Sequence, residues 1–317
     1  MTYRANPYGR RFTEAELVTH IGDASILIAG TEPISARAMD TGPKLRLIAK
    51  VGIGLDNVDL NAAIERQIAV TYTPDAPAPA VAELTVGLML DLVRGISRAN
   101  RLMHEKQWSR ILGRRLDELS VGVVGVGRVG RRLIRILRAG FPNTRVLCND
   151  LQPDENFGLE VGDLEWVTKP QIYSESDIIT LHVPLTQTTR GLVGEHEISA
   201  MKPTAVLINT SRGGIVDEEA LAAALRSHRL AGAAIDVFEP EPYTGILTNV
   251  DECILTCHMG SMSEDCRIAM ESEAVEEVVR FIRGEPLRQL VPESEYLLQK
   301  KPAAGGNSVS GTCVPEI

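Results

Sequence analysis

Short apolar runs alternate with helix-like stretches over the part of the chain that begins at Ser120. Runs of this length are typical of strands rather than of buried helices. Strands that are apolar on both faces and are joined through helices form a parallel sheet with helices on either side. The pattern therefore predicts an α/β fold for this region. The predicted strands are residues 121–125, 144–150, 177–184, 205–212, 232–238 and 253–258.

Helices are expected between most of these strands, for example over residues 129–140 and 217–228. The second has Asp217 as a candidate N-cap, acidic residues in its first turn and basic residues in its last turn, an order that the helix dipole favours. A final helix is predicted over residues 263–283, ending at Gly284. These helices would cover the faces of the sheet.

The first 75 residues repeat the alternation with shorter helices, such as residues 13–22. The prolines of the next segment end at Pro79, and apolar residues at helical spacing then predict a long helix from Val81 past Arg98. A helix of this length often links two domains or builds a dimer interface. The predicted strands of this part are residues 24–31, 45–52 and 68–74.

Composition excludes several classes of protein. The 317 residues carry a net charge of −9, without a run of clustered Lys and Arg, so neither nucleic acid nor an anionic membrane is an expected partner. There is no apolar run of about 18 residues and no signal-peptide core, so neither a membrane span nor export is predicted. Five cysteines without regular spacing indicate reduced thiols in a cytoplasmic protein.

Three glycines, Gly125, Gly127 and Gly130, follow an apolar strand and open an amphipathic helix. Asp150 ends the next predicted strand, and this arrangement is the dinucleotide-binding fingerprint in its proper context. The glycines permit a tight turn, the approach of a pyrophosphate and close helix–strand packing. Asp150 would bind a ribose 2′-hydroxyl and repel a 2′-phosphate, which favours NAD over NADP. The alternatives are a tight turn without a ligand and a solvated aspartate.

The stretch "ILTCHMGS" places His258 directly after Cys257, with Cys253 further back. This histidine is a candidate metal ligand, a packed core residue or a catalytic base. Residues four apart on one strand are about 13 Å apart, so the two cysteines cannot share one metal ion. No metal site is predicted, and the other two interpretations of the histidine remain.

Seven motifs, in this order along the chain, are "VGIGLDNVDL", "VAELTVGLML", "VGVVGVGRVG", "LHVPLTQTTRGLV", "INTSRGGIVDEEAL", "GAAIDVFEPEP" and "LTCHMGS". With these motifs the chain resembles the D-isomer-specific 2-hydroxyacid dehydrogenases, a family that includes D-3-phosphoglycerate dehydrogenase. The resemblance runs from about residue 24 to 284. It implies two Rossmann-like domains with parallel sheets and an active site in the cleft between them.

The resemblance also implies how the chain is divided. Residues 1–81 and 262–300 would form a discontinuous substrate-binding domain, and residues 82–261 an inserted NAD-binding Rossmann domain. Residues 301–317 are small and polar and are expected to be a disordered tail. The family normally has a strand and a helix before the segment that begins here at residue 5. The first βα unit of the substrate domain is therefore expected to be missing, unless the true start lies upstream.

Three residues match the family's catalytic positions: Arg212 in "NTSRGG", Glu241 in "FEPEP" and His258 in "LTCHMGS". Reduction of a 2-keto acid needs a proton on the carbonyl oxygen, and a histidine exchanges protons near neutral pH. A carboxylate on the other ring nitrogen fixes the tautomer, and an arginine binds the substrate carboxylate. The alternatives are a surface arginine, a solvated glutamate and a core histidine.

The resemblance assigns further contacts. Asp236 would bind the nicotinamide carboxamide, and His182 to Pro184 would lie along the adenosine side, although a strand-end histidine such as His182 often only packs. The cofactor candidates are Gly125, Gly127, Arg128, Val129, Gly130, Asp150, His182, Val183, Pro184, Thr210, Asp236 and His258. The substrate candidates are Gly52, Ile53, Gly54 and Arg212.

The sequence departs from the family at Cys257, where proline is usual, and at Ser261, where glycine is frequent. These changes are expected to alter local geometry only. The predicted function is NAD-dependent interconversion of a D-2-hydroxy acid and a 2-keto acid, with D-3-phosphoglycerate and D-glycerate/hydroxypyruvate as candidate substrates. The alternative is a non-catalytic, NAD-sensing protein similar to the family's corepressors. A homodimer is expected, built from the helix after Val81 and the arm that contains Trp108.

Overall fold

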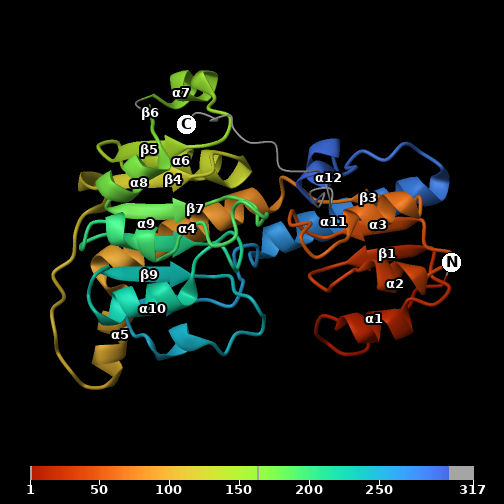
Figure 1. The fold of residues 1–317 in the computed structure, drawn as a ribbon, viewed down its shortest axis with the longest axis horizontal. Coiled ribbons are helices and arrows are strands. Elements are labelled where there is room, and N and C mark those ends of the chain that lie inside the picture. The colour runs from red at the N-terminus through yellow and green to blue at the C-terminus, as the bar shows by residue number, and fades with distance from the viewer. Residues whose placement is uncertain (1, 163, 300–317) are drawn as a thin grey trace, which may run out of the picture. The chain divides into compact units, whose positions relative to one another are not determined.

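The computed structural model describes residues 2–162 and 164–299, which divide into two compact units (Figure 1). The first unit consists of residues 2–77 and 264–299, and the second unit of residues 78–263. The boundaries between the two domains were predicted at residues 81 and 262, and the boundaries between the two units lie within a few residues of them.

The first unit is built on three parallel strands whose order in the sheet follows the sequence. They are β1 (Ile26–Ala29), β2 (Leu47–Lys50) and β3 (Ala69–Thr71). Three short helices pack on one face of this sheet: α1 (Glu14–His20), α2 (Ala36–Asp40) and α3 (Leu60–Glu65). The other face packs against α11 (Glu264–Arg283), where Leu47 and Ala49 meet Ala274 and Val278. A last helix, α12 (Glu293–Gln299), lies against α3.

The second unit contains a seven-stranded sheet, parallel throughout, in the order β10-β9-β8-β7-β4-β5-β6. Strands β5 and β6 are added on one side of β4, and the next strand in the chain, β7, pairs with the other side of β4. This reversal is the point at which open α/β sheets bind ligands. The strands are β4 (Ser120–Val124), β5 (Arg145–Asn149), β6 (Leu164–Trp166), β7 (Ile178–Leu181), β8 (Val206–Asn209), β9 (Gly232–Ile235) and β10 (Cys253–Leu255).

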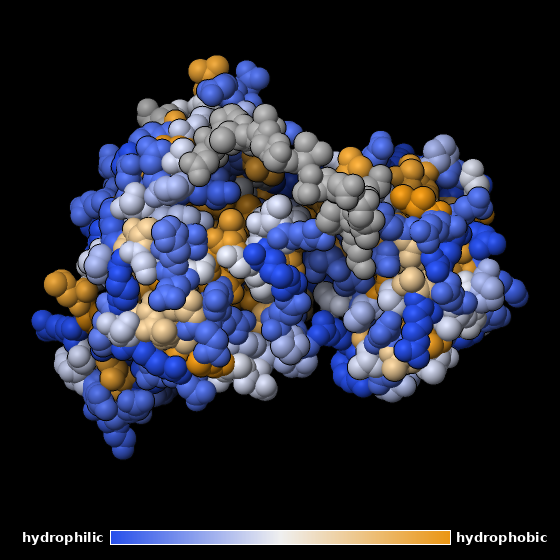
Figure 2. Space-filling model, viewed as in Figure 1, coloured by the Kyte–Doolittle hydropathy of each residue, from blue (hydrophilic) through white to orange (hydrophobic). Residues whose placement is uncertain are grey.

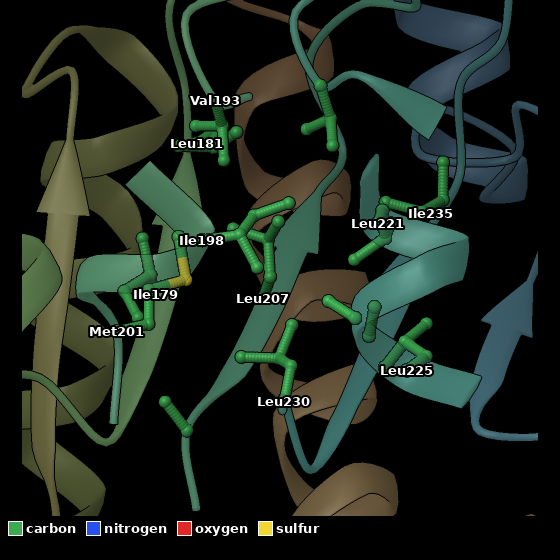
Figure 3. Close-up of a cluster of buried hydrophobic side chains, with 14 of the residues drawn as sticks. Ile179, Leu181, Val193, Ile198, Met201, Leu207, Leu221, Leu225, Leu230 and Ile235 are labelled. Carbon is green, nitrogen blue, oxygen red and sulfur yellow. The ribbon is translucent and has the colours of Figure 1, made fainter. Parts of the chain in front are cut away.

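Each face of this sheet is covered by three helices. One face packs against α8 (Lys169–Glu175), α9 (Glu195–Ala200) and α10 (Glu218–Arg226), and Figure 3 shows the buried aliphatic side chains on this side. The opposite face packs against α4 (Pro77–Arg94), α6 (Arg128–Gly140) and α7 (Glu155–Val161). Burial on both faces explains why the strands are almost entirely apolar. The α/β class and the parallel sheets are thus confirmed.

The predicted long helix is wrong in two respects. It begins earlier, because prolines at Pro77 and Pro79 fall in the first turn, where backbone N–H groups have no intrahelical acceptor. It also ends at Arg94, since Gly95 adopts a left-handed conformation (φ 65°) and redirects the chain into α5 (Ile96–His104). The side chain of Ile111 lies 2.9 Å from the position of a Cβ on Gly95, so this bend is tightly packed.

Strand β6 was not among the predicted strands, because its three residues carry a charge and show no apolar run. The other predicted strands are present; β4 is shifted by one residue toward the N-terminus, and the rest are shorter than predicted. The helices predicted over residues 129–140, 217–228 and 263–283 are confirmed as α6, α10 and α11. Asp217 caps α10 by accepting a hydrogen bond from the N–H of Ala220 (3.1 Å). Two 3₁₀ turns complete the second unit: η1 (Leu116–Glu118) and η2 (Ile246–Asn249). Within the described ranges, no helix is both long enough and apolar enough to cross a bilayer.

Candidate functional site

Three neighbouring strands of the second unit end in register. Asn209 at the end of β8 pairs with Ile235 at the end of β9, which pairs in turn with Leu255 at the end of β10. The predicted catalytic residues follow these ends in the chain: Arg212, Glu241 and His258. The expectation that Arg212 and His258 end strands is wrong, because both lie in the loops beyond. Since the strands are parallel, the three loops leave the sheet at the same edge.

His258 and Glu241 form a pair. The Nδ1 atom of His258 lies 2.9 Å and 3.0 Å from the two carboxylate oxygens of Glu241. Glu241 is itself held by the backbone N–H of Phe238, which donates to Oε1 at 3.1 Å. A carboxylate that accepts a hydrogen bond from Nδ1–H keeps the proton on that nitrogen, so Nε2 is the ring nitrogen that can exchange a proton with a ligand. The His258 side chain is 36% exposed and therefore accessible to one.

Asp236 is fully buried and organises the loop that carries His258. Its Oδ1 accepts hydrogen bonds from the Thr256 hydroxyl (2.6 Å) and the Met259 N–H (2.9 Å), and its Oδ2 from the Gly260 N–H (2.9 Å). Its backbone carbonyl accepts from the N–H of His258 at 2.7 Å. These bonds hold His258 in a left-handed conformation (φ 51°), which few residue types adopt. The contact of Asp236 with a nicotinamide carboxamide stays a prediction.

Asn209 is a positioning residue that the sequence analysis missed. Its buried side chain donates from Nδ2 to the carbonyl oxygen of Arg212 (2.8 Å) and accepts from the N–H and hydroxyl of Ser211 (3.1 and 2.7 Å). The side-chain amide of Asn209 thus holds the turn that carries the half-buried Arg212. The sequence feature that could have indicated this role is a polar residue at the end of an otherwise apolar run, at the start of "NTSRGG".

The loops of Arg212 and Glu241 are in direct backbone contact. A Cβ on Gly213 would lie 2.2 Å from the carbonyl carbon of Phe238 and 2.7 Å from the nitrogen of Glu239. Real Cβ atoms do not approach this closely, so only glycine permits the contact. The structure therefore brings the Arg212 loop against the segment that holds Glu241.

The glycine turn after β4 forms an open N-terminus for α6. Gly125 has φ 95°, and a Cβ on it would lie 2.5 Å from the carbonyl oxygen of His182. A Cβ on Gly130 would lie 2.2 Å from the Gly125 oxygen, whereas one on Gly127 would meet no atom within 4 Å. Gly127 is the N-cap and supplies no side-chain bond to the first turn. Exposed backbone N–H groups at this end fit a pyrophosphate.

Asp150 supports this turn directly. Its Oδ2 accepts a hydrogen bond from the N–H of Val126 (2.7 Å), and its Oδ1 accepts one from the N–H of Gln152 (3.0 Å). Asp150 is half-buried and directly follows β5, which ends one residue earlier than predicted, at Asn149. The contact of Asp150 with a ribose hydroxyl stays a prediction. Its hydrogen bond to the glycine turn was not predicted from the sequence.

The remaining cofactor candidates lie near the same edge of the sheet. Thr210 is buried, and its hydroxyl lies 3.1 Å from that of Thr85 on α4. Arg128 is exposed on the first turn of α6, where Val129 is half-buried. Val183 and Pro184 follow β7. The ligand contacts of these five candidates stay predictions.

His182 is packed at the end of β7. Its backbone N–H donates to the Val124 carbonyl at 2.7 Å, and its Nε2 lies 2.9 Å from the Thr180 hydroxyl. Although part of the residue is exposed, its ring is surrounded by protein atoms, and this burial lowers the pKa of His182 to about 4. The ring is therefore neutral at physiological pH.

This burial predicts a stability effect. His182 has a pKa near 6.5 in the unfolded chain and about 4 in the folded chain. The unfolded state therefore binds the proton first, and the free energy of unfolding decreases as the pH falls between these values. We expect the free energy of unfolding to drop by about 2 kcal/mol more in the wild type than in His182→Asn between pH 7.5 and 5.0. Urea unfolding at both pH values measures this, and an equal drop in the two proteins would contradict it.

The substrate candidates Gly52, Ile53 and Gly54 lie in the first unit, directly after β2. Gly52 has φ 121°, a conformation that favours glycine, and its N–H donates to the Thr73 hydroxyl at 2.7 Å. The loop thus leaves the carboxyl end of a parallel strand, as a ligand-binding loop does. An active site in a cleft between the units stays a prediction.

The cysteines of "ILTCHMGS" have different environments. Cys253 is buried in β10, whereas Cys257 is exposed in the loop beyond that strand. The two cysteines were expected on one strand, and this prediction is wrong because the strand ends at Leu255. Across residues 2–162 and 164–299, no three His, Cys, Asp or Glu side chains are grouped to hold a metal ion. Nothing in the structure explains why Cys257 replaces the usual proline.

Comparison with known proteins adds independent evidence. A family model described as D-isomer specific 2-hydroxyacid dehydrogenase, NAD binding domain, matches residues 86–260. The chain is 35% identical over 278 residues to glyoxylate reductase of Korarchaeum cryptofilum, covering 85% of this chain and 83% of that protein. It is 36% identical over 288 residues to D-3-phosphoglycerate dehydrogenase of Methanocaldococcus jannaschii, covering 88% of this chain but only 54% of that longer protein.

Among solved structures, the chain resembles D-lactate dehydrogenase from Aquifex aeolicus in complex with NAD and lactic acid. The TM-score is 0.77 at 29% identity, covering 84% of this chain and 86% of the other.

Proposed function

Because the chain belongs to the D-isomer specific 2-hydroxyacid dehydrogenase family, we propose that Arg212, Glu241 and His258 are its catalytic residues. The protein is an NAD-dependent oxidoreductase that interconverts a D-2-hydroxy acid and a 2-keto acid. The observation that carries the assignment of residues is the hydrogen-bonded pair of His258 and Glu241 at the carboxyl edge of the sheet.

In the reduction of a keto acid, Nε2 of His258 gives a proton to the carbonyl oxygen, and in the reverse direction it takes the hydroxyl proton. Glu241 accepts a hydrogen bond from the Nδ1–H group at 2.9 Å, and its negative charge stabilises the charged imidazolium. Arg212 binds the substrate carboxylate and orients the acid for reaction. In the first unit, the loop of Gly52, Ile53 and Gly54 is proposed to bind a substrate carboxylate through the N–H groups of Ile53 and Gly54, because the Gly52 N–H is already donated to Thr73.

NAD supplies the hydride acceptor when it is bound, and NADH the hydride donor. The N–H groups at the start of α6 would hold its pyrophosphate, since Gly127 leaves open space there. Asp150 would bind the adenosine ribose. Thr210 and Asp236 would lie nearest the nicotinamide end, as the loops after β8 and β9 carry them.

Small 2-keto acids are the proposed substrates. The similar proteins include a glyoxylate reductase, a hydroxypyruvate reductase and a D-3-phosphoglycerate dehydrogenase. All three proteins are named as enzymes, and none of these names supports the alternative of a non-catalytic NAD sensor. We therefore place glyoxylate, hydroxypyruvate and phosphohydroxypyruvate first in a screen.

The test follows NADH oxidation at 340 nm over a panel of 2-keto acids. We expect turnover with at least one acid of the panel and none with matched acids that lack the 2-keto group. Measurable NADH binding without turnover of any keto acid would refute the proposed activity.

Replacing Asp150 tests the cofactor preference. In Asp150→Ala the carboxylate no longer repels a 2′-phosphate, so the ratio of kcat/KM for NADH over NADPH should fall by at least tenfold, or about 1.4 kcal/mol. Because the bond to Val126 is also lost, we expect the KM for NADH to rise as well. Steady-state kinetics with both cofactors measures this. Asp154→Ala, on the neighbouring α7 cap, is the control, and an unchanged ratio in Asp150→Ala would reject the ribose contact.

We further propose a cytoplasmic homodimer that binds neither nucleic acid nor a membrane. Exposed apolar side chains gather on α5 and the arm that follows it, and apolar surface is visible over α5 at the lower left of Figure 2. They are Ile96, Met103, Trp108 and Leu112. A patch of this kind supports a protein interface. Light scattering of the purified chain would show a dimer that Leu112→Asp weakens.

A further inference from the structure

The loop between β2 and α3 is held by a residue far away in the sequence. This loop, residues 51–59, contains the glycines assigned above to the substrate carboxylate. Its start is fixed by Thr73, whose hydroxyl accepts from the Gly52 N–H and whose own N–H donates to the Gly52 carbonyl (3.2 Å). Its far half is fixed by Gln299, the last residue of α12.

The side-chain amide of Gln299 uses all of its principal bonding groups on this segment. Nε2 donates to the carbonyl oxygens of Leu55 (2.9 Å) and Val58 (3.0 Å), and Oε1 accepts from the N–H of Leu60 (3.0 Å). Both amide hydrogens and the amide oxygen are therefore engaged. The Leu60 N–H belongs to the first residue of α3, which has no acceptor within its own helix.

A second contact holds the backbone of Gln299. Asn61 on α3 donates from Nδ2 to the backbone oxygen of Gln299 at 3.3 Å, so both the main chain and the side chain of this residue are held. Asn57, in the same loop, donates from its side chain to the carbonyls of Gly30 (3.2 Å) and Glu32 (2.6 Å). The loop is thus held at Gly52 by Thr73 and at Leu55 and Val58 by Gln299, and this restricts the directions in which the N–H groups of Ile53 and Gly54 can point.

We propose that Gln299 is a positioning residue for substrate binding: through Leu55, Val58 and Leu60 it sets the orientation in which the loop presents N–H groups to the substrate carboxylate. This inference rests on the proposed function for the chemistry of the ligand, but the contacts that carry it lie entirely within the first unit. It assigns to α12 a role in binding that no motif of the sequence indicated.

The test compares Gln299→Met, which keeps the length of the side chain and removes all three bonds, with Gln299→Glu, which can accept from Leu60 but cannot donate. Both should raise the KM for the keto acid roughly tenfold, with kcat changed less than about twofold and NADH affinity unchanged, because a small displacement of a binding group weakens orientation. Gln289→Met, a glutamine of the same unit outside α12, is the control and should behave as the wild type.

Hydrogen exchange gives a readout that does not depend on activity. Amides of residues 52–60 should exchange at least about tenfold faster in Gln299→Met than in the wild type, since opening of the loop exposes them. A lower melting temperature with unchanged KM and unchanged exchange in this segment would overturn the inference and leave Gln299 a general stabiliser. Failure of the wild type to turn over any keto acid would instead count against the proposed function, while the exchange experiment would still test the contact.

Discussion

His258→Ala should lower kcat by about 10²–10⁴-fold, because proton transfer by a positioned histidine contributes this much to such reactions. The ring that is removed is 36% exposed, and its Nδ1 is bonded to Glu241, so its loss should leave the fold intact. The affinity for NADH, measured by quenching of protein fluorescence, should change by less than about threefold. The rate is measured at saturating NADH and keto acid.

The control for this experiment is His196→Ala, which removes an exposed histidine from α9 of the same unit. It should retain full activity. Glu241→Gln gives a second, graded result: it preserves the shape of the partner and removes its charge, so kcat should fall by about tenfold or more but less than in His258→Ala. Wild-type kcat in His258→Ala would reject the role assigned to this histidine.

Asp236→Asn should have the second large effect, on both rate and stability. The amide cannot accept from both Met259 and Gly260, so one of its N–H groups would face a backbone donor in a fully buried site. A buried donor without an acceptor costs about 1–3 kcal/mol. Because the loop carries His258, we expect kcat to fall by about 10²-fold as well. Urea unfolding and saturated kinetics measure the two effects.

Thr256→Val is the matched control for Asp236→Asn. It removes one of the three donors, the Thr256 hydroxyl, and leaves the carboxylate with its two backbone bonds. The loss of stability should be about 1 kcal/mol, and the rate should change by less than about tenfold. If Asp236→Asn retained the wild-type rate, the loop would not depend on this carboxylate, and its role in placing His258 would be rejected.

The sequence was sufficient for features that rest on local pattern. Apolar runs located all strands except β6, and the glycine spacing located the turn into α6. The pairing of Glu241 with His258 followed from the resemblance and is present in the structure. By contrast, the break at Gly95 depends on its packing against Ile111, and a single glycine within a helical pattern gives no sign of such a contact.

Supporting contacts were harder to foresee because they join residues far apart in the chain. The bond from Val126 to Asp150 spans 24 residues, and those of Gln299 span up to 244. Asn209 and Asp236 could be recognised as polar residues next to buried strands, but their partners are backbone groups of a turn whose shape the sequence did not specify. A motif can therefore identify such a polar residue, whereas the contacts that it makes need coordinates.

The discontinuity of the first unit has a consequence for synthesis on the ribosome. Residues 2–77 emerge early, but the helix that covers the second face of their sheet begins at Glu264, and the amide that closes the loop before α3 comes from Gln299. The second unit is one continuous segment and can fold as soon as it has emerged. The early strands must therefore wait, with one apolar face uncovered, until nearly the whole of the described chain has been made. Exposed apolar surface of this kind makes an incomplete chain prone to aggregation.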